Sequence, residues 1–254
     1  MNRLPLDMLP TDDAVSGSRI DRTNSAPTPI TEPSELSVFA PLHYEPKYAY
    51  PLIVWLHSEG QSESQLRYVM PRISMRNYAA VAPRGTTDWT LEAPSDEAER
   101  FSWCQSGQHV EAATERILNA IDQGCQGLNI HSDRVFIAGS GCGGTMAFRV
   151  AMSMPEQFCG VLSLGGSFPI GNAPLGRLND ARRLPLFVAV GRGNGDYPES
   201  ALCTDLRLFH AAGMAVTIRQ YPGEDQLNDL MLADVDRWIM DTIASGQRAP
   251  VIAS

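Results

Sequence analysis

Short apolar runs alternate with longer amphipathic segments along most of the chain. Seven runs, several of them rich in β-branched residues, have the pattern of buried strands: Leu36–Ala40, Leu52–His57, Ala79–Pro83, Val135–Gly139, Gly160–Leu164, Leu186–Gly191 and Val216–Tyr221. Segments with helical periodicity lie between several of them, at about 62–76, 110–125, 143–153, 199–212 and 229–243. This alternation predicts an α/β fold with a mostly parallel, twisted sheet and helices on both faces.

Such a sheet also predicts where a ligand would bind. Ligands of open α/β sheets bind beyond the carboxyl ends of the strands, in the loops that follow them. The candidate loops are therefore those after His57, Gly139, Leu164, Gly191 and Tyr221.

The two ends of the chain lack this periodic pattern. Residues 1–33 are rich in Pro, Ser, Thr and Asp, and we expect them to form a flexible or docking N-terminal extension. The folded α/β domain is then expected over residues 34–246, with a C-terminal tail over 247–254.

Composition narrows the classes of partner. The chain has 29 acidic and 20 basic residues and a net charge of −9, which argues against binding to nucleic acid or to anionic lipid. No stretch is long and apolar enough to span a membrane, and residues 1–10 are interrupted by Pro5 and Asp7, unlike a secretory signal. We therefore expect a cytoplasmic protein.

The cysteines give no sign of a disulfide framework or a metal site. They are five, widely spaced and without a CxxC pair, so we expect free thiols, no metal and no cofactor. Their positions are Cys104, Cys125, Cys142, Cys159 and Cys203.

A glycine-rich turn follows the predicted strand Val135–Gly139. Residues 139–144 read Gly-Ser-Gly-Cys-Gly-Gly and lead directly into a predicted helix. A phosphate loop needs a Lys that this turn lacks. A dinucleotide fingerprint is only partly met, and it would follow the first strand of the sheet instead of one in mid-chain. A third interpretation is a nucleophile elbow, the strand-to-helix turn that presents a catalytic Ser in hydrolases.

Further motifs favour the elbow, and together they resemble one family. From about Leu36 to Ile243 the chain is similar to the α/β-hydrolase fold, specifically to the phospholipase/carboxylesterase (acyl-protein thioesterase-like) family. The segments that carry the resemblance occur in the family's order: Leu52–His57, Ala82–Gly85, Ser102-Trp103, Asp133–Gly139, Met154–Phe158 and Tyr221–Gly223.

The resemblance also indicates which positions would carry the catalytic triad. The family's elbow reads Gly-x-Ser-x-Gly-Gly, which places Gly141 at the nucleophile position. The family's acid loop aligns with residues 191–198 and places Asn194 at the acid position. The loop of the family's catalytic histidine aligns with residues 221–226 and places Gln226 there. All three triad positions would therefore be replaced.

Each replacement removes a chemical step. Glycine has no nucleophilic atom, a glutamine amide does not take up and return a proton near neutral pH, and asparagine carries no negative charge. We therefore expect a catalytically degenerate α/β-hydrolase, a pseudo-esterase that acts as a binding, scaffold or assembly protein. Its partner would be another protein, a second copy of the chain, or a small apolar or acyl ligand.

The expected oxyanion loop departs from the family as well. Residues 57–60 read His-Ser-Glu-Gly where the family has His-Gly-x-Gly. The carboxylate of Glu59 would oppose a negative charge developing in the site, whereas Ser58 need not block a backbone donor. The N–H of Cys142 would be the second donor, and Trp103 is a candidate to line the pocket.

A shifted register offers an alternative function. Cys142 would then be the nucleophile, at the start of a helix, where a thiolate is stabilised. Among the five histidines, only His57 is predicted beside the elbow; the others are His43, His109, His131 and His210. Cys142 with His57 would make the protein a carboxylic-ester or thioester hydrolase.

Overall fold

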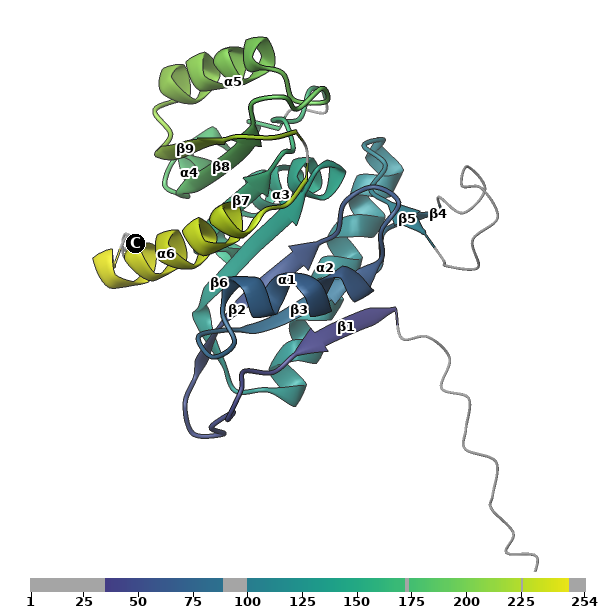
Figure 1. The fold of residues 1–254 in the computed structure, drawn as a ribbon, viewed down its shortest axis with the longest axis vertical. Coiled ribbons are helices and arrows are strands. Elements are labelled where there is room, and N and C mark those ends of the chain that lie inside the picture. Colours follow the sequence, from purple (N-terminus) through teal and green to yellow (C-terminus); the bar gives the residue numbers. More distant parts are fainter. Residues whose placement is uncertain (1–34, 89–99, 172–173, 225, 247–254) are drawn as a thin grey trace, which may run out of the picture. The chain divides into compact units, whose positions relative to one another are not determined.

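The structure is a computed structural model, and it describes residues 35–88, 100–171, 174–224 and 226–246 (Figure 1). The predicted N-terminal extension and C-terminal tail lie outside these residues, so both stay predictions.

A seven-stranded sheet forms the centre of the described chain. Its strands are β1 (Leu36–Phe39), β2 (Tyr50–Leu56), β3 (Ala79–Pro83), β6 (Ile130–Ser140), β7 (Gly160–Leu164), β8 (Leu186–Gly191) and β9 (Val216–Tyr221). Their order in the sheet is β1-β3-β2-β6-β7-β8-β9. Only β1 runs antiparallel to its neighbour, β3, and the other pairs are parallel. The predicted mostly parallel sheet is confirmed.

Helices cover both faces of this sheet (Figure 1). They are α1 (Leu66–Ile73), α2 (Gly107–Gly127), α3 (Cys142–Ser153), α4 (Leu178–Ala181), α5 (Glu199–Ala212) and α6 (Asp229–Ser245), with short 3-10 turns η1 (Glu63–Gln65) and η3 (Pro155–Gln157). Buried residues of α1 and α6 belong to one core cluster, and those of α2, α3 and α5 belong to the other. The two clusters lie on opposite faces of the sheet, as the fold class requires.

Strand β2 shows why the apolar runs are continuous. All seven of its residues are buried. Leu52, Val54 and Leu56 contribute to the α2/α3/α5 cluster, whereas Ile53 and Trp55 contribute to the α1/α6 cluster. Successive side chains of a strand point to opposite faces, so a strand covered on both faces must be apolar at every position.

The predicted elements differ from the observed ones mainly at their ends. Strand β6 begins five residues before the predicted Val135, because Ile130 pairs with Tyr50 ahead of a register shift, after which Val135 pairs with Leu52. The helical segment at 62–76 divides into η1 and the shorter α1. A two-residue pair, β4 (Thr87–Asp88) with β5 (Phe101–Ser102), has no apolar pattern and was not predicted.

Two further expectations concern the whole chain. No described helix combines the length and apolar character that crossing a bilayer demands. The structure joins none of the five cysteines in a disulfide.

The packing of α3 against β2 predicts a steric effect on stability. A Cβ at Gly143 would lie 2.5 Å from the carbonyl oxygen of His57 and against that of Leu56. Overpacking of this kind costs roughly 1–3 kcal/mol, so Gly143→Ala is expected to lower the free energy of unfolding by about that much in urea denaturation. Gly127→Ala is the control, because no heavy atom lies within 4 Å of its added Cβ. Equal stability of the two variants would contradict the described packing.

Candidate active site

The turn between β6 and α3 has the geometry of a nucleophile elbow. Gly141 adopts φ 53° and ψ −123°, and its N–H donates to the carbonyl of Leu164 on β7 at 2.9 Å. A positive φ in this region strains any residue with a side chain, typically by about 1–3 kcal/mol, and glycine avoids that cost.

The residues that flank Gly141 are closely packed. A Cβ at Gly139 would lie 2.5 Å from the backbone of Gly143, and one at Gly144 would collide with the hydroxyl of Ser163. At Gly141 itself, the one heavy atom of the described residues within 4 Å of an added Cβ is Cβ of Ser58, at 3.8 Å. The turn therefore requires small residues on both sides and leaves space for a side chain at position 141.

The predicted oxyanion loop lies beside this position. The side chain of Gln65 accepts from the N–H of Ser58 at 3.3 Å and donates to its hydroxyl at 2.8 Å. The N–H of Gly60 donates to the carbonyl of Phe101 at 3.0 Å. Within the described residues, the N–H groups of Glu59 and Cys142 have no acceptor. Two backbone donors next to the turn are therefore available for a ligand oxygen.

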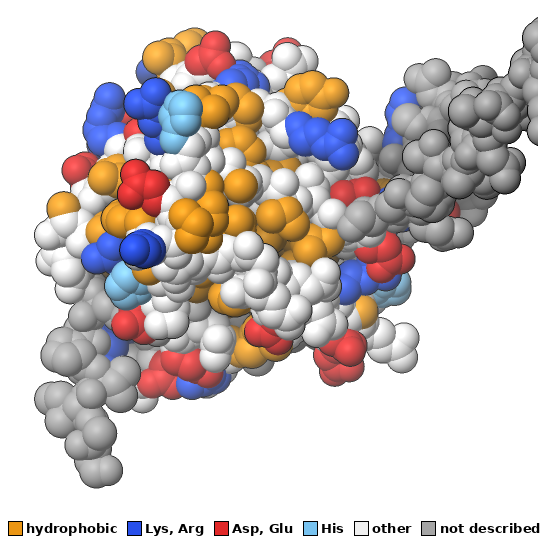
Figure 2. All heavy atoms as spheres, turned by 90° about the horizontal axis from the view of Figure 1, so that it is seen from below, with side chains coloured by type: hydrophobic (Ala, Val, Ile, Leu, Met, Phe, Trp, Pro, Cys, Tyr) orange, Lys and Arg blue, Asp and Glu red, His pale blue; other side chains and the backbone are white. Residues whose placement is uncertain are grey.

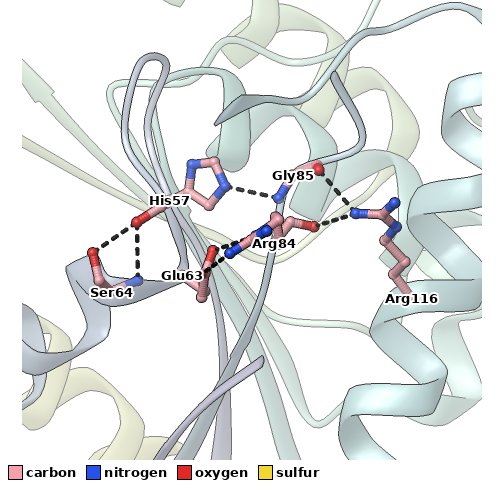
Figure 3. A network of polar contacts seen from close by, with 7 residues as sticks. His57, Glu63, Ser64, Arg84, Gly85 and Arg116 are labelled. Carbon is pink, nitrogen blue, oxygen red and sulfur yellow. Dashed lines mark hydrogen bonds and ion pairs between the residues drawn. The ribbon is translucent and has the colours of Figure 1, made fainter. Parts of the chain in front are cut away.

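His57 follows β2 and is fully buried. Its Nε2 accepts from the N–H of Gly85 at 2.9 Å (Figure 3). Its Nδ1 lies 2.9 Å from the carbonyl of Ser58, to which it donates. Desolvation lowers the pKa of His57 to about 4. The imidazole is therefore neutral near pH 7, and both of its nitrogens are used in holding the loops together.

A buried ion pair supports the same loops. The guanidinium of Arg84 donates to both carboxylate oxygens of Glu63, at 2.9 and 3.2 Å, and stacks 4.5 Å from the ring centre of Phe101. Arg116 donates to the carbonyls of Arg84 and Gly85 at 3.3 and 3.0 Å (Figure 3). Glu63, Arg84 and Arg116 cannot be recognised from the sequence as part of the site, since ion pairing across 21 residues leaves no local pattern.

Cys142 begins α3, and its thiol faces β5. Its Sγ lies 3.5 Å from the hydroxyl of Ser102, and it has no hydrogen bond to a histidine among the described residues. Burial raises the pKa of this thiol, and the nearby carboxylate of Glu59 acts in the same direction. Trp103 is buried beside it and donates from Nε1 to the carbonyl of His57 at 3.1 Å. The structure does not join the hypothetical nucleophile Cys142 to the hypothetical base His57.

Asn194 is buried in the loop after β8 and has a structural role there. Its Oδ1 accepts from the N–H groups of Asp196 and Tyr197 at 2.9 and 2.8 Å, which closes the loop onto the start of α5. The loop is tied to the one after β9, because the N–H of Gly193 donates to the carbonyl of Gly223 at 2.9 Å. The two loops that were expected to carry the acid and the histidine are thus neighbours.

Gln226 lies in the second of these loops and is exposed. Its side chain makes no hydrogen bond to any described residue. Elsewhere, His109 Nδ1 lies 2.6 Å from the hydroxyl of Ser106, but this contact is exposed and spans the first turn of α2. No three His, Cys, Asp or Glu side chains of the described ranges come together in a way that would hold a metal ion.

The geometry agrees with the comparisons to known proteins. The profile of the Phospholipase/Carboxylesterase family matches residues 45–192, more than half of the chain. The chain belongs to this family. Comparison with curated proteins finds no match. The matched range includes the turn at Gly141 but ends before Asn194 and Gln226.

Solved structures show the same fold at low sequence identity. SOBER1 of Arabidopsis thaliana is 19% identical with a TM-score of 0.63, over 77% of this chain and 100% of that one. A carboxylesterase from Mesorhizobium loti is 17% identical with a TM-score of 0.62, over 76% and 90%. The Bacillus cereus carboxylesterase is 14% identical with a TM-score of 0.61, over 82% and 93%. These similarities establish the α/β-hydrolase fold.

The burial of His57 predicts a pH effect on stability. Because its pKa falls from 6.5 to about 4 on folding, only the unfolded chain takes up a proton between these values. Above pH 6.5 the titration of His57 is therefore expected to leave the free energy of unfolding unchanged. As the pH falls from 6.5 toward 4, that free energy should drop by up to about 1.4 kcal/mol per pH unit. Urea denaturation at several pH values checks this, with His57→Gln expected to show the shallower dependence; equal slopes would contradict it.

The raised pKa of Cys142 predicts slow alkylation. In the folded protein at pH 7.5, iodoacetamide is expected to modify the exposed Cys203 well before the mostly buried Cys142, as followed by peptide mass spectrometry. In urea the two thiols should react at similar rates. Preferential labelling of Cys142 in the folded state would indicate an activated thiolate.

Proposed function

We propose that this member of the phospholipase/carboxylesterase family is catalytically degenerate and acts as a binding, scaffold or assembly protein. The observation that carries the proposal is Gly141. It occupies the strained position of the elbow, where a side chain has space, and it offers no nucleophilic atom.

The environment of the proposed triad positions supports this interpretation. Asn194 accepts two backbone hydrogen bonds, a function that its amide oxygen performs without a negative charge. Gln226 is exposed and has no proton-transfer chemistry near neutral pH. Loss of the nucleophile or of the base alone removes most of the rate acceleration of a triad.

The free N–H groups of Glu59 and Cys142 favour a binding role over a purely inert one. Two unpaired backbone N–H groups beside an open position can donate hydrogen bonds to a carbonyl or carboxyl oxygen. The proposed ligand is accordingly a small acyl compound, or an acylated or apolar segment of a protein partner. That partner can be a second copy of the chain. The carboxylate of Glu59 would select against a second negative charge at this place.

The alternative, an ester or thioester hydrolase that uses Cys142 and His57, has less support. It needs a thiolate and a free imidazole nitrogen. The pKa of Cys142 is raised by burial, and both nitrogens of His57 already have backbone partners. Turnover through Cys142 would require the contact between His57 and Gly85 to break.

An esterase assay separates the two functions. Purified protein with p-nitrophenyl acetate is expected to show no turnover above that of Gly141→Ala, because neither glycine nor alanine has a nucleophilic atom that could be acylated. Cys142→Ala should leave that background unchanged. Turnover that survives purification and is lost in Cys142→Ala would establish the alternative, whereas an acyl ligand that raises the melting temperature without being cleaved supports the binding role.

Restoring the triad is the converse experiment. The combined variant Gly141→Ser, Asn194→Asp and Gln226→His is expected to hydrolyse p-nitrophenyl acetate at a rate above that of the parent. Removing the opposing carboxylate as well, with Glu59→Gly, is expected to raise the rate further. The matched control keeps Gly141 and carries the other substitutions; equal rates in the control and the restored variant would show that position 141 does not face the substrate.

A further inference from the structure

A cavity lies at the end of the sheet opposite to Gly141. Its volume is about 270 Å³, and its walls include Tyr50, the first residue of β2, and Arg134, which lies in the first half of β6. Gly141, in contrast, follows the last residue of β6. Arg76 before β3 and Met240 near the end of α6 complete the part of the wall considered next. The cavity is therefore separate from the elbow.

One wall of the cavity is aromatic and held in place. The rings of Tyr48 and Tyr50 meet edge to face, with centroids 4.6 Å apart, and Tyr44 stacks on Tyr50 at 5.4 Å. The hydroxyl of Tyr50 accepts from the N–H of Glu45 at 3.1 Å, and that of Tyr44 accepts from the N–H of Asn129 at 2.6 Å. Tyr48 is half exposed, so one of its faces is available to a ligand.

Two arginines from distant parts of the chain, Arg76 and Arg134, line the same cavity. Within the described residues, neither the Arg76 nor the Arg134 side chain has a hydrogen bond or an ion pair. The carboxylate of Asp236 near this region already accepts from Asn77 at 3.1 Å and Tyr78 at 2.8 Å. Glu45 is the one carboxylate among the lining residues against two arginines, and the carboxylate of Asp236 lies next to the lining residue Asn77.

Basic and apolar groups lie next to one another on this side of the molecule. Figure 2 views the chain from below, the side on which Figure 1 places the segment between β1 and β2. Hydrophobic side chains gather in the middle of this face, and charged side chains of both signs lie around them. This mixture is typical of sites that bind an amphipathic small molecule instead of a purely apolar one.

We propose that this cavity binds a small organic anion that carries a flat ring. The ring would pack against Tyr48 and Met240, and a carboxylate or phosphate group would pair with Arg76 and Arg134. Guanidinium groups bind planar oxyanions through two parallel hydrogen bonds, and aromatic side chains offer a face for stacking. The volume lies just below the roughly 300–1,000 Å³ common for ligand pockets, so a single-ring compound fits best.

Calorimetric titration of the full chain with phenyl phosphate and with benzoate tests the proposal. We expect one or both to bind, and the double variant Arg76→Gln/Arg134→Gln to weaken binding about tenfold or more, equivalent to about 1.4 kcal/mol. The control is Arg207→Gln on the exposed face of α5, where the arginine is also without a described partner, and it should bind like the parent. Single substitutions at Arg76 and Arg134 should each give an intermediate loss.

Two further probes and a map of the site make the test discriminating. Inorganic phosphate and benzyl alcohol should each bind more weakly than phenyl phosphate, because each lacks one half of the ligand. Amide NMR shifts on titration should centre on Tyr48, Tyr50 and Arg134. Shifts centred on Gly141, unchanged affinity in the double variant, or no binding of either anion at 10 mM would overturn the proposal.

Discussion

The close approach of α3 to β6 and β2 is the contact on which the rest of the site depends. The backbones of Gly139 and Gly143 leave no room for a Cβ between them. A Cβ at Gly143 would also collide with the carbonyl oxygens of Leu56 and His57. The backbone of helix α3 can therefore lie this close to the sheet only with glycine at these two positions. The turn that leads into it must adopt a positive φ at position 141, whatever chemistry that position carries.

This constraint fixes the geometry of the turn independently of any side chain at position 141. The geometry is held by the flanking glycines and by the hydrogen bond from Gly141 to Leu164, not by a side chain at position 141. Glycine even relieves the backbone strain that a serine would introduce there.

A second constraint is the neutral imidazole of His57. It joins the end of β2 to Gly85, and Gly85 is held in turn through its carbonyl by Arg116. An imidazole used in this way is dry, uncharged and without a free nitrogen, so its surroundings oppose the proton uptake that a general base requires. The same burial keeps the imidazole neutral near pH 7.

The sequence by itself determined the order and type of the main elements and the likeness to a hydrolase family. Continuous apolar runs such as Leu186–Gly191 can be recognised as strands from the sequence, because a strand covered on both faces must be apolar throughout. The glycines of the turn predicted a strand-to-helix turn because they lie within a few residues of one another in the sequence. Short elements such as β4 and β5 were not, since a two-residue pairing depends on a distant partner strand.

Only the tertiary structure decided what the candidate side chains do. His57 bonds to Gly85 across 28 residues, and Cys142 has no histidine partner among the described residues. Asn194 bonds within its own loop, and Arg76 lines the same cavity as Arg134. These outcomes depend on burial and on contacts between segments far apart in the chain. A local pattern encodes which face of an element is buried, whereas the partner of a buried polar atom is set by the packing of all the elements together.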